Sequence, residues 1–168
     1  MTSRAAMVSS KFIAAVVQAA PVFMDRAATT RKACRLIREA SEKGAKVIAF
    51  PESFIPAFPY GVWHHGVKRN MRFYRALTES AVHLDDPEVL ALQAAAREAR
   101  MVVVMGITER DGGSLYNSQL FIGADGALLG ALIPPEAEGQ PPEMRVFLVP
   151  STDYRIVETW NTFGLRAT

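Results

Sequence analysis

The hydrophobic positions of the chain fall into short apolar runs separated by longer amphipathic segments. The apolar run at 12–17 suits a strand that is buried on both faces, and we expect it to be the first central strand of a sheet. A second strand is predicted at 46–50. Asp25 offers an N-cap and Gly44 a C-terminal glycine for a helix between them. Apolar residues recur along that helix at the spacing of one face: Ala33, Leu36, Ile37 and Ala40.

Two more helices are predicted in the middle of the chain. A loop rich in proline and aromatic residues covers 52–63, and a helix is expected at about 67–80. Asp86 followed by Pro87 marks the start of a further helix, because aspartate is a good N-cap and proline suits the first helical position. The buried face of this helix is marked by Val89, Leu92, Ala96 and Ala99.

Three strands are predicted next, which makes the chain a member of the α/β class. The run at 101–107 is the most strand-like in the sequence, and a turn at 111–113 leads to a strand at 115–122. Asp125 and Gly126 form a tight-turn signal before a short strand at 127–129. The order strand, helix, strand, helix, helix, strand, strand, strand predicts a mixed sheet covered by helices on at least one face.

The regular pattern is lost between 131 and 150. This segment holds five of the ten prolines and three glutamates, and neither a helical nor a strand period is visible. We therefore expect a disordered tail at 1–10 and a single domain at 11–168, with 131–150 irregular inside it.

Composition and charge exclude several classes of function. Apolar residues make up 49% of the chain and charged residues 21%, which is ordinary globular composition. The formal charge is only +2 and the basic residues are scattered, so no nucleic acid partner is predicted. No apolar run is long enough to cross a membrane. A single cysteine, Cys34, excludes an internal disulfide and a thiolate zinc cluster. We expect a cytoplasmic protein.

Glu52 is the strongest candidate for a catalytic residue. It comes just after a buried strand, and the carboxyl ends of strands in α/β sheets are where ligand crevices form. A carboxylate walled there by aromatic side chains suits a general base. The alternative is a glutamate that only caps the following loop by accepting backbone N–H groups. Its position alone leaves both interpretations open.

Four segments together resemble a known family. They are 12–18, 44–59 with Phe50-Pro51-Glu52, 103–110, and 115–122 followed by Asp125-Gly126. In this order and spacing they resemble the N-terminal half of the nitrilase family of carbon–nitrogen hydrolases, and the nitrilase branch in particular. The resemblance runs from about Phe12 to Gly130. It implies an α-β-β-α sandwich, present in this chain in an incomplete form.

The resemblance also implies a mechanism. The family uses a glutamate base, a lysine and a cysteine nucleophile to hydrolyse nitriles or amides, and Glu52 falls on the glutamate. The carboxylate takes the thiol proton, the thiolate attacks the substrate carbon, and the ammonium stabilises the developing charge. No metal and no organic cofactor is implied. A small-molecule nitrile or amide is the expected substrate if the chain is active.

The chain departs from the family at the other two catalytic residues. The lysine belongs shortly after Gly130, but all five lysines lie at or before Lys68. The cysteine belongs beyond 163–164. Cys34 lies in the middle of a predicted helix, where free cysteines are usually small core residues. We therefore expect a chain that is C-terminally truncated relative to the family and inactive on its own.

A change of reading frame would explain the irregular segment. Pro135 to Gly139 can be encoded CCG-GAA-GCT-GAA-G, and the same bases read one nucleotide later give Arg-Lys-Leu-Lys, the basic stretch that the family carries. Ordinary divergence in a proline-rich loop is the alternative. Reading the coding DNA in its other frames distinguishes the two.

Five further residues are candidates for the surroundings of Glu52. The aromatic residues Phe58, Tyr60 and Trp63 either line a substrate pocket or cover the edge of the core. The polar residues Glu109 and Asn117 lie near strand ends and either orient Glu52 by hydrogen bonding or satisfy loop amides.

Two alternatives to an active hydrolase remain. The chain is either a non-catalytic partner, through homo-oligomers or association with a full-length relative, or a part of an enzyme whose missing residues come from another polypeptide. Half of a sandwich exposes apolar sheet faces, which favours association.

Overall fold

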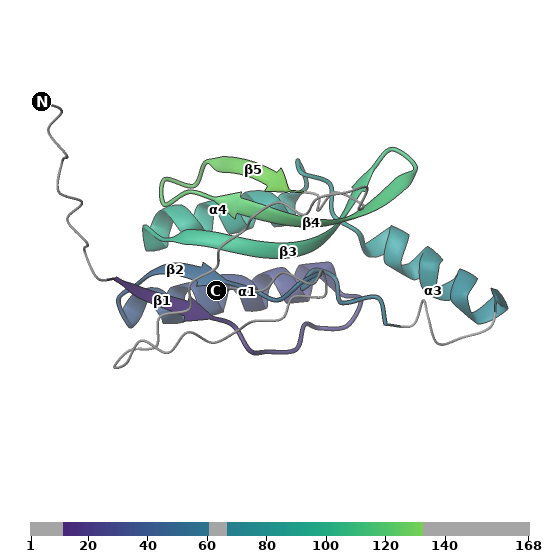
Figure 1. The fold of residues 1–168 in the computed structure, drawn as a ribbon, viewed down its shortest axis with the longest axis horizontal. Coiled ribbons are helices and arrows are strands. Elements are labelled where there is room, and N and C mark those ends of the chain that lie inside the picture. The colour runs from purple at the N-terminus through teal and green to yellow at the C-terminus, as the bar shows by residue number, and fades with distance from the viewer. Residues whose placement is uncertain (1–11, 61–66, 133–168) are drawn as a thin grey trace, which may run out of the picture.

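The computed structural model describes residues 12–60 and 67–132, which form one sheet and three helices (Figure 1). The predicted tail at 1–10, Trp63 and the segment 133–150 lie outside the described residues. The elements follow in the predicted order: β1 (Ile13–Val16), α1 (Arg26–Glu42), β2 (Ala45–Ala49), α3 (Val67–Ser80), α4 (Pro87–Ala99), β3 (Val102–Asp111), β4 (Ser114–Ile122) and β5 (Leu128–Leu132).

The sheet is mixed, and its strands lie in the order β1-β2-β3-β4-β5. β1, β2 and β3 are parallel, while β3, β4 and β5 are antiparallel hairpin neighbours. The two parallel connections contain helices and the two antiparallel ones are short turns, as expected for each kind of pairing. The α/β class and the mixed sheet are confirmed.

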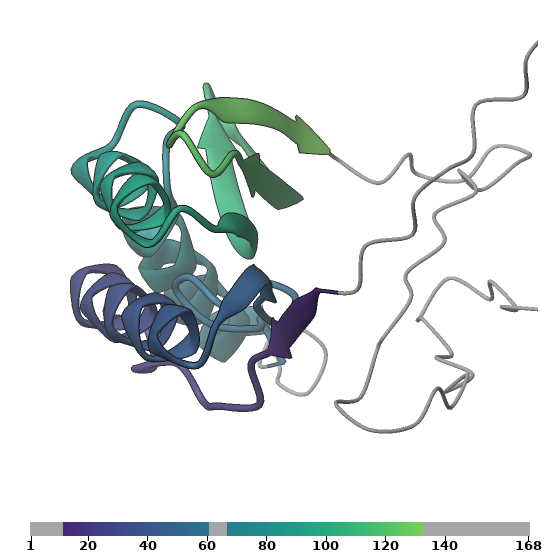
Figure 2. The ribbon, with the colours of Figure 1, turned by 90° about the vertical axis from the view of Figure 1, so that its left-hand side faces the viewer.

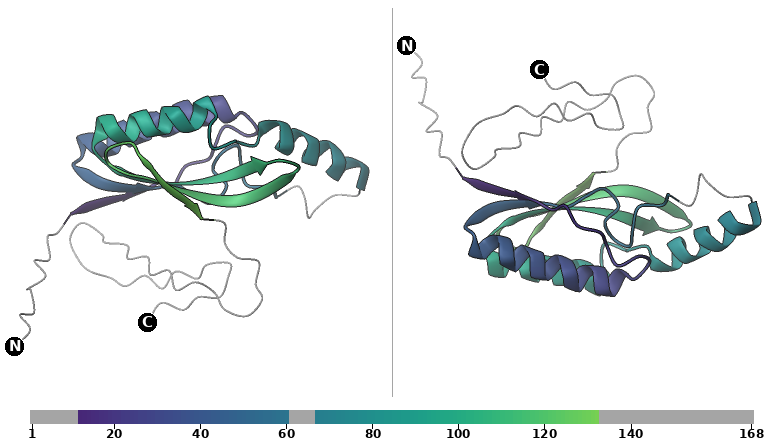
Figure 3. Two further views of the ribbon diagram at one scale, coloured as in Figure 1. Left: turned by 90° about the horizontal axis from the view of Figure 1, so that it is seen from above. Right: turned by 90° about the horizontal axis from the view of Figure 1, so that it is seen from below.

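Two helices cover one face of the sheet. α1 and α4 lie side by side on it (Figures 2 and 3), and their apolar faces pack against alternate residues of the strands. α3 projects beyond the sheet at the end where the β3–β4 turn lies (Figure 1). The buried core includes Ile37 and Ala40 from α1, Leu92 and Ala96 from α4, and Ile48, Val103, Met105, Ile107, Leu120 and Ile122 from the strands.

The two N-cap aspartates differ in whether local sequence or a tertiary contact determines their hydrogen bonds. The predicted cap at Asp25 is confirmed, since its Oδ1 accepts from the backbone N–H of Ala28 at 2.8 Å. Asp86 occupies the N-cap of α4 but makes no capping bond. Its Oδ2 accepts instead from Arg26 Nη1 at 2.7 Å and from the His83 amide at 2.9 Å. This ion pair links the start of α1 to the start of α4.

The prediction for the first strand is wrong in one respect. Among the described strands β1 is at the edge of the sheet and not at its centre, and Ile13 and Val16 are 52% and 60% exposed. Only Ala15 and Val17 of this run pack against the core. An apolar run does not reveal which of its two faces is covered, so periodicity alone could not distinguish the two cases.

No described helix is long and apolar enough to cross a membrane. β5 extends through Leu132, so the described structure includes the first two residues of the segment expected to be irregular.

Candidate active site

After β2 the backbone runs alongside β3 and forms hydrogen bonds with it. These bonds fix the position of Glu52. The Phe50 amide donates to the Val104 carbonyl at 2.9 Å, and the Ile55 amide donates to the Gly106 carbonyl at 3.2 Å. Between these two bonds the backbone makes a turn over 51–53. Glu52 is therefore held at the carboxyl end of β2 by main-chain bonds on both sides.

Gly106 allows the turn to approach β3. A Cβ at this position would lie 2.2 Å from the Pro51 carbonyl oxygen, 2.7 Å from the Ser53 nitrogen and 2.8 Å from Cα of Glu52. All three are backbone atoms, so no side-chain rotation would relieve the clash. Sequence reasoning did not single out Gly106, although a lone glycine inside a strand is a known sign of close backbone approach.

The turn lies over the face of the sheet opposite the helices. Met105 and Ile107 belong to the core shared with α1 and α4, so Gly106 between them points to the other face. Asn117, which pairs with Thr108, is on the same face as Gly106. The side chains of the turn and of β4 can therefore meet there.

Asn117 is the partner of Glu52. Its Nδ2 donates to Oε1 of Glu52 at 2.5 Å, and the carboxylate is half-buried. In the described residues the donor is thus a side chain of β4 and not a backbone amide of the loop. The structure places these two predicted site residues in direct contact.

Ser53 completes the cluster and was missed by sequence reasoning. Its Oγ donates to Oδ1 of Asn117 at 3.1 Å, and the residue is only 1% exposed. Its backbone has φ of +46°, a left-handed conformation that is uncommon for residues other than glycine. No pattern in the sequence marks such a position.

Glu109 lies apart from this cluster. It is 7% exposed, and its Oε2 accepts from the Ser118 hydroxyl at 2.6 Å. Ser118 pairs with Ile107, so this bond is on the helix side of the sheet. Of the two polar candidates, the structure brings Asn117 to Glu52 and places Glu109 against Ser118.

The aromatic residues after β2 divide into two groups. Phe50 and Phe54 are buried in the core, with ring centroids 5.3 Å apart. Phe58 and Tyr60 also stack, at 4.6 Å, but Tyr60 is 68% exposed and Phe58 is half-buried. The first pair fixes the start of the loop in the core, while the second pair lies nearer the surface.

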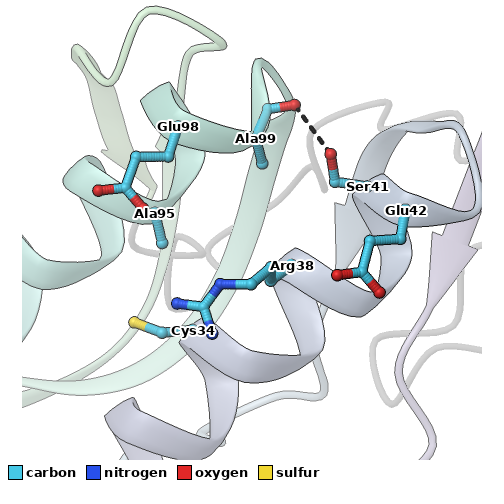
Figure 4. A pocket seen from close by; sticks show the side chains of 7 residues that line it. All are labelled: Cys34, Arg38, Ser41, Glu42, Ala95, Glu98 and Ala99. Atoms are coloured by element: carbon cyan, nitrogen blue, oxygen red, sulfur yellow. Dashed lines mark hydrogen bonds between the residues drawn. The ribbon is translucent and has the colours of Figure 1, made fainter.

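Cys34 lies at a separate place, between the two helices. It borders a hollow of about 170 Å³ (Figure 4) with Arg38, Ser41, Glu42, Ala95, Glu98 and Ala99. Its thiol donates to the Ala91 carbonyl at 3.7 Å. Burial raises the pKa of the Cys34 thiol and outweighs Arg38, which lowers it. The thiol is therefore protonated near neutral pH, and neither Glu52 nor Asn117 lines its hollow.

No cluster of three or more histidine, cysteine or acidic residues that could hold a metal ion is present in the described part of the chain.

Comparison with known proteins assigns the family. The sequence profile of the family described as Carbon-nitrogen hydrolase matches residues 13–152. The chain belongs to this family. Its relatives place it in the nitrilase branch. It is 44% identical over 122 residues to an aliphatic nitrilase of Rhodococcus rhodochrous, and 42% identical over 120 residues to a nitrilase of Bacillus sp..

The matched region is a limited part of those relatives. It covers 72% of this chain and 33% of the Rhodococcus rhodochrous protein, and 71% and 35% for the Bacillus sp. protein. An arylacetonitrilase of Aspergillus kawachii is 41% identical over 121 residues, with 72% and 36% covered. The chain thus spans about one third of the length of the relatives it matches.

Solved structures show the same fold. A carbon–nitrogen hydrolase from Helicobacter pylori G27 superimposes with a TM-score of 0.55 at 19% identity, covering 71% of this chain and 38% of that one. A CN-hydrolase superfamily protein from Xanthomonas campestris gives 0.52 at 16% identity, with 71% and 39% covered. The described residues therefore carry one sheet and one helix layer of the fold of this carbon–nitrogen hydrolase family.

Proposed function

We propose that the chain descends from a nitrile- or amide-hydrolysing enzyme and keeps the glutamate base of that enzyme as Glu52. The observation that carries this proposal is the hydrogen bond from Asn117 to Oε1 of Glu52 at the carboxyl end of β2. It fixes a half-buried carboxylate on the side of the sheet opposite α1 and α4. A carboxylate held in this way is suited to accept a thiol proton.

The 168-residue chain is proposed to be inactive by itself. Proton transfer to Glu52 produces no catalysis unless a nucleophile and a cation stand beside the substrate. No lysine follows Lys68 in the sequence, and the single cysteine is the protonated Cys34 between the helices. The Glu–Lys–Cys set is thus represented by Glu52 alone.

A hydrolysis assay tests this proposal. We expect purified chain to release no ammonia above the buffer rate from an aliphatic nitrile, an arylacetonitrile or the corresponding amides. Cys34→Ala should behave like the unmodified chain. Ammonia release that disappears in Glu52→Gln would contradict the proposed inactivity, because it would show a complete site that depends on this carboxylate.

A second candidate function is association, and the sheet face that no described helix covers favours it. The strand register places Val16, Ala49, Val104, Phe121 and Gly130 in one row across all five strands. These residues alternate with the helix-facing core, and Val16 at the edge is 60% exposed. None of the described residues forms a second layer over this row. An apolar face of this kind commonly marks a contact surface.

We propose that this face binds a second copy of the chain or a full-length relative. The turn that carries Glu52 lies over the same face, so a partner packed there would lie close to Glu52. A lysine or cysteine from that partner could then complete the catalytic set. Ammonia release that appears only after mixing with such a partner would identify this case.

Sedimentation tests the association. We expect the chain to sediment as an oligomer, and Val16→Lys to shift it toward monomer because a charge on the apolar face must be desolvated on contact. Leu90→Lys is the matched control, since Leu90 is 59% exposed but lies on α4. A monomer that melts cooperatively without either substitution would exclude this function.

A further inference from the structure

We infer that Ser53 is a positioning residue for Glu52 and acts through Asn117. The inference rests on the proposed role of Glu52 as the base. It assigns to the Ser53 hydroxyl the anchoring of the Asn117 amide at its Oδ1 end. It assigns to the anchored amide the position of the Glu52 carboxylate.

The direction of the hydrogen bonds follows from the chemistry of the three groups. An ionised carboxylate only accepts, so the Nδ2 end of the Asn117 amide must face Glu52. Oδ1 then faces Ser53, whose hydroxyl donates to it at 3.1 Å. With the amide rotated by half a turn, its oxygen would meet the carboxylate oxygen without a proton between them. The carboxylate thus sets the orientation of the amide, and the Ser53 hydroxyl anchors the opposite end of the amide in that orientation.

The backbone of Ser53 supports a role for its side chain. The φ of +46° is a conformation that glycine adopts at lower cost, and Ser53 is 1% exposed. A serine is therefore disfavoured here on backbone grounds. Its hydroxyl bond to Asn117 is the contact that distinguishes it from glycine at this position, and strained residues with such contacts concentrate at functional sites.

The three residues come from two segments that are far apart in sequence. Glu52 and Ser53 follow β2, whereas Asn117 is on β4 and lies 65 residues from Glu52. β3 runs between β2 and β4 in the sheet, and Gly106 on β3 provides the space across which the turn reaches β4. The position of the Glu52 carboxylate therefore depends on the register of the β3–β4 hairpin.

The test is the exchange of the Asn117 side-chain amide protons with water, measured by NMR on the labelled full chain. Asn117→Ala assigns the signal, and the exposed Gln18 side chain serves as an internal reference. In the unmodified chain we expect exchange about tenfold slower than at Gln18, because the amide donates to a charged acceptor. Glu52→Ala should remove this protection.

Two substitutions of Ser53 distinguish the inference from a merely structural role. Ser53→Ala removes the hydroxyl, and Ser53→Gly removes it while relieving the backbone. Both should bring exchange at Asn117 to within about twofold of Gln18, because an amide that is no longer held at Oδ1 keeps its bond to Glu52 for a smaller share of the time. Ser118→Ala is the control, since it removes a neighbouring hydroxyl on the opposite face of β4 and should leave the exchange unchanged.

The inference is overturned if exchange at Asn117 is the same in Ser53→Gly as in the unmodified chain, or if Ser118→Ala accelerates it equally. Ser53→Gly keeps this test decisive even if Ser53→Ala does not fold, because glycine tolerates the positive φ. No turnover is measured. The result is therefore independent of whether the chain, alone or with a partner, hydrolyses nitriles.

Discussion

Gly106→Ala is expected to lower the free energy of unfolding by about 3 kcal/mol, the upper part of the range for an added methyl group in a packed site. The new Cβ would meet three backbone atoms of the turn over 51–53, the nearest at 2.2 Å. The turn is bonded to β3 on both sides of this point, so it could not move away without breaking those bonds. This loss must exceed the advantage of about 0.5–1 kcal/mol that alanine has over glycine in a strand.

Urea denaturation followed by circular dichroism measures this effect. Gly113→Ala is the matched control, because a Cβ there meets nothing within 4 Å and its φ is not positive. Its stability should change by less than about 0.5 kcal/mol. Equal stability of the two variants would contradict the close packing of the turn on β3.

The elements of the fold were largely predictable from the sequence because local signals and packing agree in them. Strand and helix order followed from the period of apolar residues, and the Asp25 cap and the Asp125-Gly126 turn from residue chemistry. The edge position of β1 in the described sheet was not predicted, because strand order is a tertiary property. Asp86 is the N-cap of α4 as predicted, but its side chain makes no capping hydrogen bond, since Arg26, 60 residues away, binds the carboxylate.

The cluster around Glu52 was only partly predictable from the sequence. Glu52 and Asn117 were both candidates, but the hydrogen bond between them depends on register across three strands. Side chains alternate between the two faces along β3, so Glu109 lies on the same face as the buried Met105 and Ile107. This alternation would have placed Glu109 on the face opposite Asn117. Ser53 had no signal in the sequence, because its role depends on a positive φ and a contact with β4.

Leu92→Ala is expected to lower the free energy of unfolding by about 3 kcal/mol, within the range for truncating a buried leucine. Leu92 is 1% exposed on the inner face of α4 and belongs to the core that joins both helices to the sheet. That core holds the helix side of β3, whose opposite side carries Gly106 and the turn with Glu52. Removal of three carbon atoms leaves a cavity that the packed helices cannot fill completely.

Leu90→Ala provides the comparison within the same helix. Leu90 is 59% exposed, so the same change of side chain should alter stability by less than about 0.5 kcal/mol. Both variants have the same helix propensity change, and the difference in their urea midpoints therefore measures burial alone. A similar loss in both would mean that α4 does not pack on the sheet through Leu92. The support of β3 beneath the Glu52 turn would then have to come from α1.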